Sequence, residues 1–223
     1  MRNFLLNYGS ILVIVITVIV VIKTYLLIAR YIRNRQISDL LLALLSLGLC
    51  YDAIVLTIGI FLAPDRIEGL SRLRYILHGA LIPLILPISL KTCGLGKKPM
   101  IAVYVITALL SIAGIVEGFV TELEVSTIAN VNRYMAAEAT PAWAHTFSRI
   151  MSFGSVVPLI IGGIYLIIKK KNWWMLLSGL VMLLFSALGP ITGNTDLIFM
   201  ISMPGELLMM IFLAMAVHQT AEE

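Results

Sequence analysis

Seven apolar stretches dominate this sequence, and they restrict the chain to a membrane-spanning fold. Each is close to the roughly 20 residues that an α-helix needs to cross a bilayer. Hydrophobic residues make up 60% of the chain and charged residues 13%, whereas soluble domains carry about 25% charged residues. We predict an all-α bundle, a single transmembrane domain over residues 1–223, with spans at 10–31, 38–62, 74–90, 100–120, 143–168, 173–191 and 196–217.

The first stretch is expected to remain in the protein as a helix. A signal peptide has an apolar core of about 7–15 residues, followed by a small-residue cleavage site. Residues 11–32 form a longer apolar run, and no such site follows it.

The distribution of basic residues predicts the orientation of the bundle. With seven spans, the first, third and fifth connections lie on one side of the membrane. Because loops rich in lysine and arginine stay in the cytoplasm, we expect the N-terminus outside and the C-terminus inside, in the plasma membrane. The same rule explains the net charge of +4 without a nucleic-acid partner. These connections contain Arg30, Arg33, Arg35, Lys91, Lys97, Lys98, Lys169, Lys170 and Lys171.

Two other connections are long enough to hold structure of their own. Residues 63–73 include a charged, partly apolar run after Pro64, which indicates a short surface helix. Residues 121–142 carry Val125, Ile128, Val131 and Tyr134 at intervals of three. This spacing predicts an amphipathic helix on the outer surface, acting either as a lid over a pocket or as a shield for helix ends.

Two acids lie within the apolar stretches, at Asp52 and Glu206. An acid at the centre of a bilayer costs roughly 2.5–3.5 kcal/mol, so it needs a compensating interaction. Both lie ten residues from the outer ends of the predicted helices, about 15 Å deep at 1.5 Å per residue. We expect them to line a polar cavity that opens outward together with His78 and Arg149, with Tyr51, Arg74 and Glu117 as weaker candidates.

A purely structural interpretation of these charges is equally open. Asp52 would then pair with His78 or Arg74, and Glu206 with Arg149. Buried pairs of this kind fix the register of neighbouring helices.

Several chemistries do not fit the sequence. A retinal protein needs a lysine in its last helix, and 196–217 has none. The three histidines, His78, His145 and His218, show no HxxxH or HExxH spacing, so no metal site is predicted. We also find no GxSxG, P-loop or dinucleotide motif, and therefore predict no cofactor.

Three functions remain, and they belong to different classes. The leading hypothesis is binding and transport of a small molecule or ion, because mid-bilayer acids lie beside a possible helix break at Pro204 and Gly205. The second is a membrane-embedded lipid hydrolase or transferase that uses Asp52 and His78. The third is a receptor or assembly factor without chemistry. Beyond the lipid bilayer, the partner is an unidentified small molecule, ion or lipid.

Overall fold

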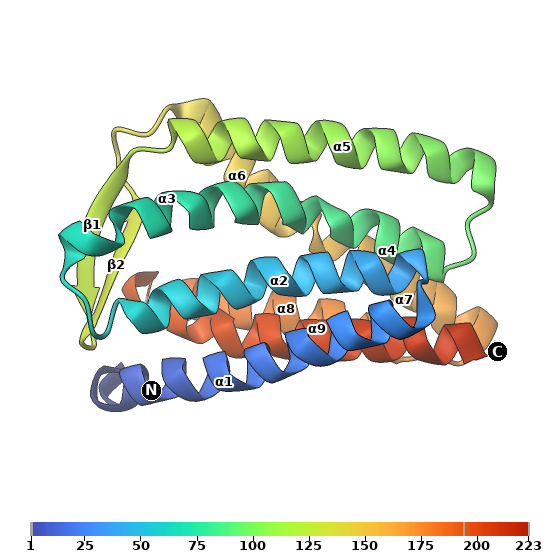
Figure 1. Cartoon of the computed structure of the whole chain (residues 1–223), viewed down its shortest axis with the longest axis horizontal. Coiled ribbons are helices and arrows are strands. Elements are labelled where there is room, and N and C mark those ends of the chain that lie inside the picture. Colours follow the sequence, from blue (N-terminus) through green and yellow to red (C-terminus); the bar gives the residue numbers. More distant parts are fainter. Residues whose placement is uncertain (1, 194, 223) are drawn as a thin grey trace.

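The computed structural model describes residues 2–193 and 195–222, and it is a bundle of long helices with one small β-hairpin (Figure 1). Seven helices are long and apolar enough to cross a membrane, which confirms the predicted fold class. The elements are α1 (Arg2–Asn34), α2 (Ile37–Ile58), α3 (Pro64–Leu81), η1 (Ile82–Leu84), α4 (Ile85–Thr92), α5 (Lys97–Val120), β1 (Leu123–Ile128), β2 (Val131–Ala136), α6 (Ala142–Gly154), α7 (Val156–Lys170), α8 (Trp174–Ile191), η2 (Thr195–Leu197) and α9 (Ile198–Glu222).

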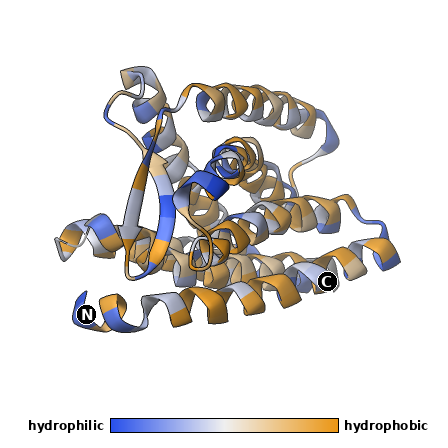
Figure 2. Cartoon of the chain, turned by 60° about the vertical axis from the view of Figure 1, so that its left-hand side comes forward, coloured by the Kyte–Doolittle hydropathy of each residue, from blue (hydrophilic) through white to orange (hydrophobic). Residues whose placement is uncertain are grey.

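The helices run side by side, and the two ends of the bundle differ. The hairpin β1–β2 crosses one end, where the chain also begins, and the C-terminus lies at the other end (Figure 1). We call these the hairpin end and the lysine end, because the second carries the basic α4–α5 and α7–α8 connections. Apolar residues cover the lengths of the helices, and polar residues gather at the ends and on the hairpin (Figure 2).

The span boundaries differ from the predicted ones at several places, and two of these change the hairpin end of the bundle. α1 begins at Arg2 rather than near residue 10. Residues 64–73, predicted as a separate surface helix, are the first turns of α3. Pro64 supplies the helix start, because a proline at the first helical position loses no intrahelical hydrogen bond. The third span therefore extends beyond its apolar part at the hairpin end.

The connection 121–142 forms an antiparallel hairpin, so the predicted amphipathic helix is wrong. Ala129 and Asn130 have φ of 52° and 61°, which makes a tight left-handed turn between the strands. The residues spaced by three are symmetric about this turn and become cross-strand pairs, Val125 with Tyr134 and Ile128 with Val131. The same spacing that predicts a helix thus fits a hairpin, and the β-branched residues of β1 favour the strand.

The hairpin is fastened to the bundle through β2. Val131 and Tyr134 are buried there, and Val131 packs with Leu5 and Met200 in an apolar cluster formed mainly by α1, α2 and α9. The Asn132 side chain donates a hydrogen bond to the Leu62 carbonyl at 2.9 Å. The loop after α2 therefore anchors the hairpin over the helix ends.

Prolines accompany interruptions in two of the spans. Pro83 lies in the 3₁₀ turn η1 that joins α3 to α4. Pro158 cannot donate to the carbonyl of Gly154, and the fifth span breaks at Ser155 into α6 and α7. α9, in contrast, continues through Pro204 and Gly205, so the expected break there is absent. Gly205 has a packing role, because a Cβ atom would lie 2.5 Å from the Cβ of Phe185 on α8.

Glycines let α3 and α5 touch backbone to backbone. A Cβ atom on Gly114 would collide with the carbonyl of Gly79, and one on Gly118 would lie 2.7 Å from the backbone nitrogen of Ile76. Small residues four apart are a common means of close helix packing in membranes. This contact sets the position of α3, which carries Arg74 and His78, against Glu117 of α5.

Replacing Gly114 by leucine should destabilise the protein, by about 1–3 kcal/mol or more, because the side chain has no room between α3 and α5. Thermal unfolding of the purified protein in mild detergent measures this. Gly69→Ala is the matched control, since a Cβ atom there meets nothing within 4 Å. Equal stability of the Gly114→Leu protein and the control would contradict the close α3–α5 contact.

Candidate functional site

Asp52 of α2 forms an ion pair with Arg74 of α3. The Arg74 Nε and Asp52 Oδ1 atoms are 2.9 Å apart, and the two side chains are 14% and 16% exposed. The guanidinium also lies 5.2 Å from the centre of the Tyr75 ring. Of the two bases considered for Asp52, the structure therefore pairs it with Arg74.

Glu206 of α9 has no such counterpart. No basic side chain among the described residues lies within 4.0 Å of its carboxylate, so the expected pair with Arg149 does not form there. Arg149 is exposed on α6 instead. Asp52 and Arg74 are nevertheless close enough to Glu206 to interact with it electrostatically. Asp52 is thus neutralised by direct contact with Arg74, whereas Glu206 has no base in ion-pair contact among the described residues.

Both acids lie in the half of the bundle next to the hairpin. Asp52 is six residues before the end of α2, and Glu206 eight residues after the start of α9. At 1.5 Å per residue these positions are about 9 and 12 Å from the helix ends, less deep than the predicted 15 Å. Asp52 is shallower mainly because α2 ends at Ile58.

A cavity of about 210 Å³ surrounds the ion pair, and we call it the polar cavity. Residues from α2, α3, α5, α6 and α9 line it, and many of them are charged or carry a hydroxyl group. Its lining consists of Asp52, Leu56, Arg74, Tyr75, His78, Gly79, Ile82, Glu117, Phe147, Ser148, Met151, Ser152, Phe199, Ser202 and Glu206.

A second cavity, of about 440 Å³, joins the polar cavity and extends between α6–α7 and α8–α9. We call it the apolar cavity, because most of its wall is hydrocarbon, from residues such as Leu49, Ile85, Met182 and Met209. The two cavities have six lining residues in common, so they lie side by side, and we call them together the joined cavities. The shared residues are His78, Ile82, Ser148, Ser152, Ser202 and Glu206.

A small void of about 20 Å³ lies on the opposite side of the two acids, toward α1. Asp52, Glu206 and Lys23 of α1 line it. The two carboxylates therefore have Lys23 on one side and Arg74 with His78 on the other. This arrangement spreads compensating charge around the acids from both directions.

Six of the seven residues predicted for the site line the joined cavities: Asp52, Arg74, His78, Glu117, Arg149 and Glu206. The seventh, Tyr51, instead donates a hydrogen bond from its hydroxyl to the Leu70 carbonyl at 3.1 Å and ties α2 to α3. Whether these residues bind a ligand stays a prediction.

Prediction from the sequence missed several polar residues of this region, Ser202 and Arg133 among them. Ser202 lies one helical turn before Glu206, a spacing that puts both on the same face of α9. Arg133 was not expected near the site, because its segment was predicted as a surface helix.

Arg133 of β2 covers the polar cavity on the hairpin side. Its side chain is 6% exposed, and its guanidinium lies 3.9 Å from the centre of the ring of Phe199, which lines the cavity. Its Nη2 donates to the Asp196 carbonyl at 3.3 Å. Burial, together with the charge of Arg74, lowers the pKa of Arg133 to about 10, so the group stays charged at neutral pH.

The end of α5 fixes Glu117 at the edge of the polar cavity. The Thr121 hydroxyl contacts Glu117 Oε1 at 3.2 Å, and the Glu117 side chain is nearly fully buried. Arg72 of α3 donates to the last carbonyls of α5, at Phe119 and Thr121. A cation at this position satisfies carbonyls that have no intrahelical partner.

The described residues do not assemble a hydrolytic triad. The Ser152 hydroxyl donates to the Ser148 carbonyl at 2.9 Å, and Asp52 pairs with Arg74 rather than His78. Among residues 2–193 and 195–222, no three His, Cys, Asp or Glu side chains are grouped to hold a metal ion.

A second polar cluster lies at the lysine end. Asp39 accepts hydrogen bonds from Arg30 Nε at 3.3 Å and Asn34 Nδ2 at 3.2 Å, and His218 Nε2 lies 3.5 Å from it. His218 is thus far from His78, at the opposite end of the bundle. These contacts join α1, α2 and α9 near the chain's basic loops.

No protein-family model matches the sequence, and no curated protein matches it.

Removing one member of the Asp52–Arg74 pair should destabilise the protein more than replacing both. Asp52→Leu leaves the buried guanidinium uncompensated, which costs about 3–5 kcal/mol, and Arg74→Met is the second single variant. The double variant Asp52→Leu/Arg74→Met should recover most of that loss. Thermal unfolding of the wild type, both single variants and the double variant completes the cycle. Additive effects of the two single changes would show that the pair does not couple α2 to α3 energetically.

Proposed function

We propose that this multi-pass membrane protein binds a small molecule in the polar cavity and transports it. The observation that carries the proposal is Glu206, an acid within a membrane-spanning helix that faces the cavity without a base in ion-pair contact among the described residues. A purely structural set of buried charges would be expected to neutralise each acid directly. Glu206 instead leaves a charge or hydrogen-bonding group available for a ligand.

The size and composition of the site support binding. Ligand sites are mostly apolar, measure about 300–1,000 Å³ and contain a few converging polar groups. The joined cavities match this description, with His78 and Glu206 where the polar and apolar parts meet. Intramembrane charges that face a cavity also mark substrate and ion pathways in transporters.

The basic loops support the proposal that the hairpin end faces the outside of the cell. The lysine end carries the basic connections between α4 and α5 and between α7 and α8. Under the rule that such loops remain in the cytoplasm, the hairpin and the polar cavity lie in the outer half of the plasma membrane.

Cysteine labelling tests this orientation. In a protein lacking the native Cys50 and Cys93, a membrane-impermeant maleimide should label Glu124→Cys on the hairpin in intact cells. It should label Lys169→Cys at the end of α7 only after the cells are permeabilised. The reverse pattern would overturn the orientation. Both positions are exposed, so access to the reagent depends on the membrane alone.

A lipid hydrolase or transferase is the second candidate, because His78 shares the polar cavity with the hydroxyl groups of Ser148, Ser152 and Ser202. It is less well supported, since the serine contacts and the Asp52–Arg74 pair do not form a proton-transfer chain. Turnover of a lipid by the purified protein, lost in His78→Ala, would favour it over transport.

Native mass spectrometry of the protein, purified from its own membrane in mild detergent, tests the binding role. The wild type should retain a bound small molecule, and Glu206→Gln should reduce its occupancy about tenfold, the effect of losing about 1.4 kcal/mol of binding energy. Glu68→Gln is the matched control, because Glu68 is an exposed acid of α3 away from both cavities. A wild type without any bound molecule, or equal occupancy in both variants, would contradict the proposal.

A further inference from the structure

The joined cavities have a polar end and an apolar end, and this division indicates the kind of molecule they fit. Charged and hydroxyl groups surround the polar cavity, whereas Leu49, Ile85, Met182 and Met209 supply the wall of the apolar cavity. A water-soluble metabolite would leave the apolar wall uncovered, and a hydrocarbon would leave Glu206 without a polar partner from the ligand. A molecule with a polar head and a hydrocarbon chain satisfies both parts.

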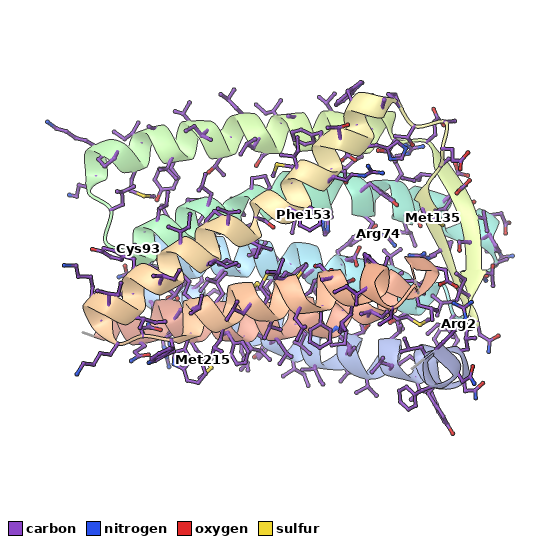
Figure 3. The ribbon with its side chains drawn as sticks, turned by 180° about the vertical axis from the view of Figure 1, so that it is seen from behind. Arg2, Arg74, Cys93, Met135, Phe153 and Met215 are labelled. Atoms are coloured by element: carbon purple, nitrogen blue, oxygen red, sulfur yellow. The ribbon has the colours of Figure 1, made fainter. Side chains whose placement is uncertain are left out.

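The apolar cavity reaches the outer surface of the bundle between α6 and α8. On the α6 side Ser152 is exposed and Phe153 is 61% exposed; on the α8 side Leu183 is 39% exposed. All three line the cavity. Because α6 and α8 belong to membrane-spanning segments, this opening faces lipid. Figure 3 shows Phe153 on the diagonal α6–α7 segment and Arg74 nearer the hairpin.

The route from water is covered by the hairpin. β2 packs over the hairpin end of the bundle, and its Val131, Arg133 and Tyr134 are buried. Arg133 lies over Phe199, which belongs to the wall of the polar cavity. The hairpin thus packs over the end of the bundle next to the polar cavity, whereas a molecule arriving from the bilayer meets the opening between α6 and α8 directly.

The charges of the joined cavities suit a head with both signs of charge. The linings contain three acids, Asp52, Glu117 and Glu206, and two arginines, Arg74 and Arg149, so there is no excess of positive charge to hold an anion. Glu206 can meet a cationic group at the junction of the cavities. Arg149, exposed at the rim on α6, can meet a phosphate.

We infer that the ligand is a zwitterionic membrane lipid, or an amphiphile of that form, which enters sideways between α6 and α8. The cationic end of the head lies in the polar cavity near Glu206, the phosphate lies at the rim near Arg149, and one hydrocarbon chain occupies the apolar cavity. This inference rests on the proposed binding role and specifies its substrate class and route.

A photoreactive lipid tests the inference. The full-length protein is reconstituted into vesicles of phosphatidylcholine that contain a small fraction of phosphatidylcholine with a diazirine on its acyl chain. After illumination, mass spectrometry locates the labelled residues. Met209 is the informative position, because it is 2% exposed and yet lines the apolar cavity. Leu213, one turn along α9, is the internal control, since it is 0% exposed and outside both cavities.

The expected result is labelling of Met209 without labelling of Leu213. Ser152→Trp, which places a large side chain at the opening, should reduce Met209 labelling about tenfold. Ile150→Trp is the matched variant, because Ile150 is on the same helix, 62% exposed and outside both cavities, and it should leave the labelling unchanged. A phosphatidylglycerol with the same diazirine chain should label Met209 less than phosphatidylcholine does.

An unlabelled Met209, or labelling that Ser152→Trp leaves unchanged, would overturn the lateral route. Equal labelling by the anionic lipid would overturn the zwitterionic head. These results are distinct from failure of the proposed function. If a water-soluble molecule is retained by the wild type and lost in Glu206→Gln while Met209 stays unlabelled, the binding role holds and the inference fails.

Discussion

An ion pair between Asp52 and Arg74 holds the centre of this bundle together, and much of the surrounding architecture serves it. Charged groups inside a membrane are tolerated when they face one another or a cavity rather than lipid. To bring a carboxylate of α2 to 2.9 Å from a guanidinium of α3, the two helices must keep one register. The backbone contact of α3 with α5 and the Tyr51 hydrogen bond to Leu70 both restrict that register.

The seven membrane spans could be predicted from the sequence, because they follow from its apolar composition. The acidic and basic residues that line the polar cavity could be predicted as well. Long apolar runs have one structural solution in a bilayer, which is why the seven spans are confirmed. The same physics identifies Asp52 and Glu206, since an acid in such a run has to face the interior. Helical periodicity also places His78 one turn after Arg74, and both line the polar cavity.

Pairing and loop structure depend on information that a pattern does not contain. Arg74 and His78 were equal candidates for Asp52, and only side-chain geometry separates them. The hairpin was mistaken for a helix because residues placed symmetrically about a two-residue turn repeat at helical spacing. That error also hid Arg133, which reaches Phe199 only because β2 turns it toward the bundle. Pro204 is the opposite case, in which a pattern predicts an interruption that does not occur. A proline usually interrupts a helix, but α9 continues through Pro204 because neighbouring helices support it.

The break at Ser155 has a mechanical consequence. α6 and α7 are two short rods joined where Pro158 leaves the Gly154 carbonyl without its helical donor. A change of angle at this hinge costs less than within a continuous helix, because Pro158 removes one of the helical hydrogen bonds that would resist it. Such a movement would widen or narrow the gap beside Phe153 while α2, α3 and α9 keep their positions. The bundle thus combines a rigid charged centre with one adjustable wall.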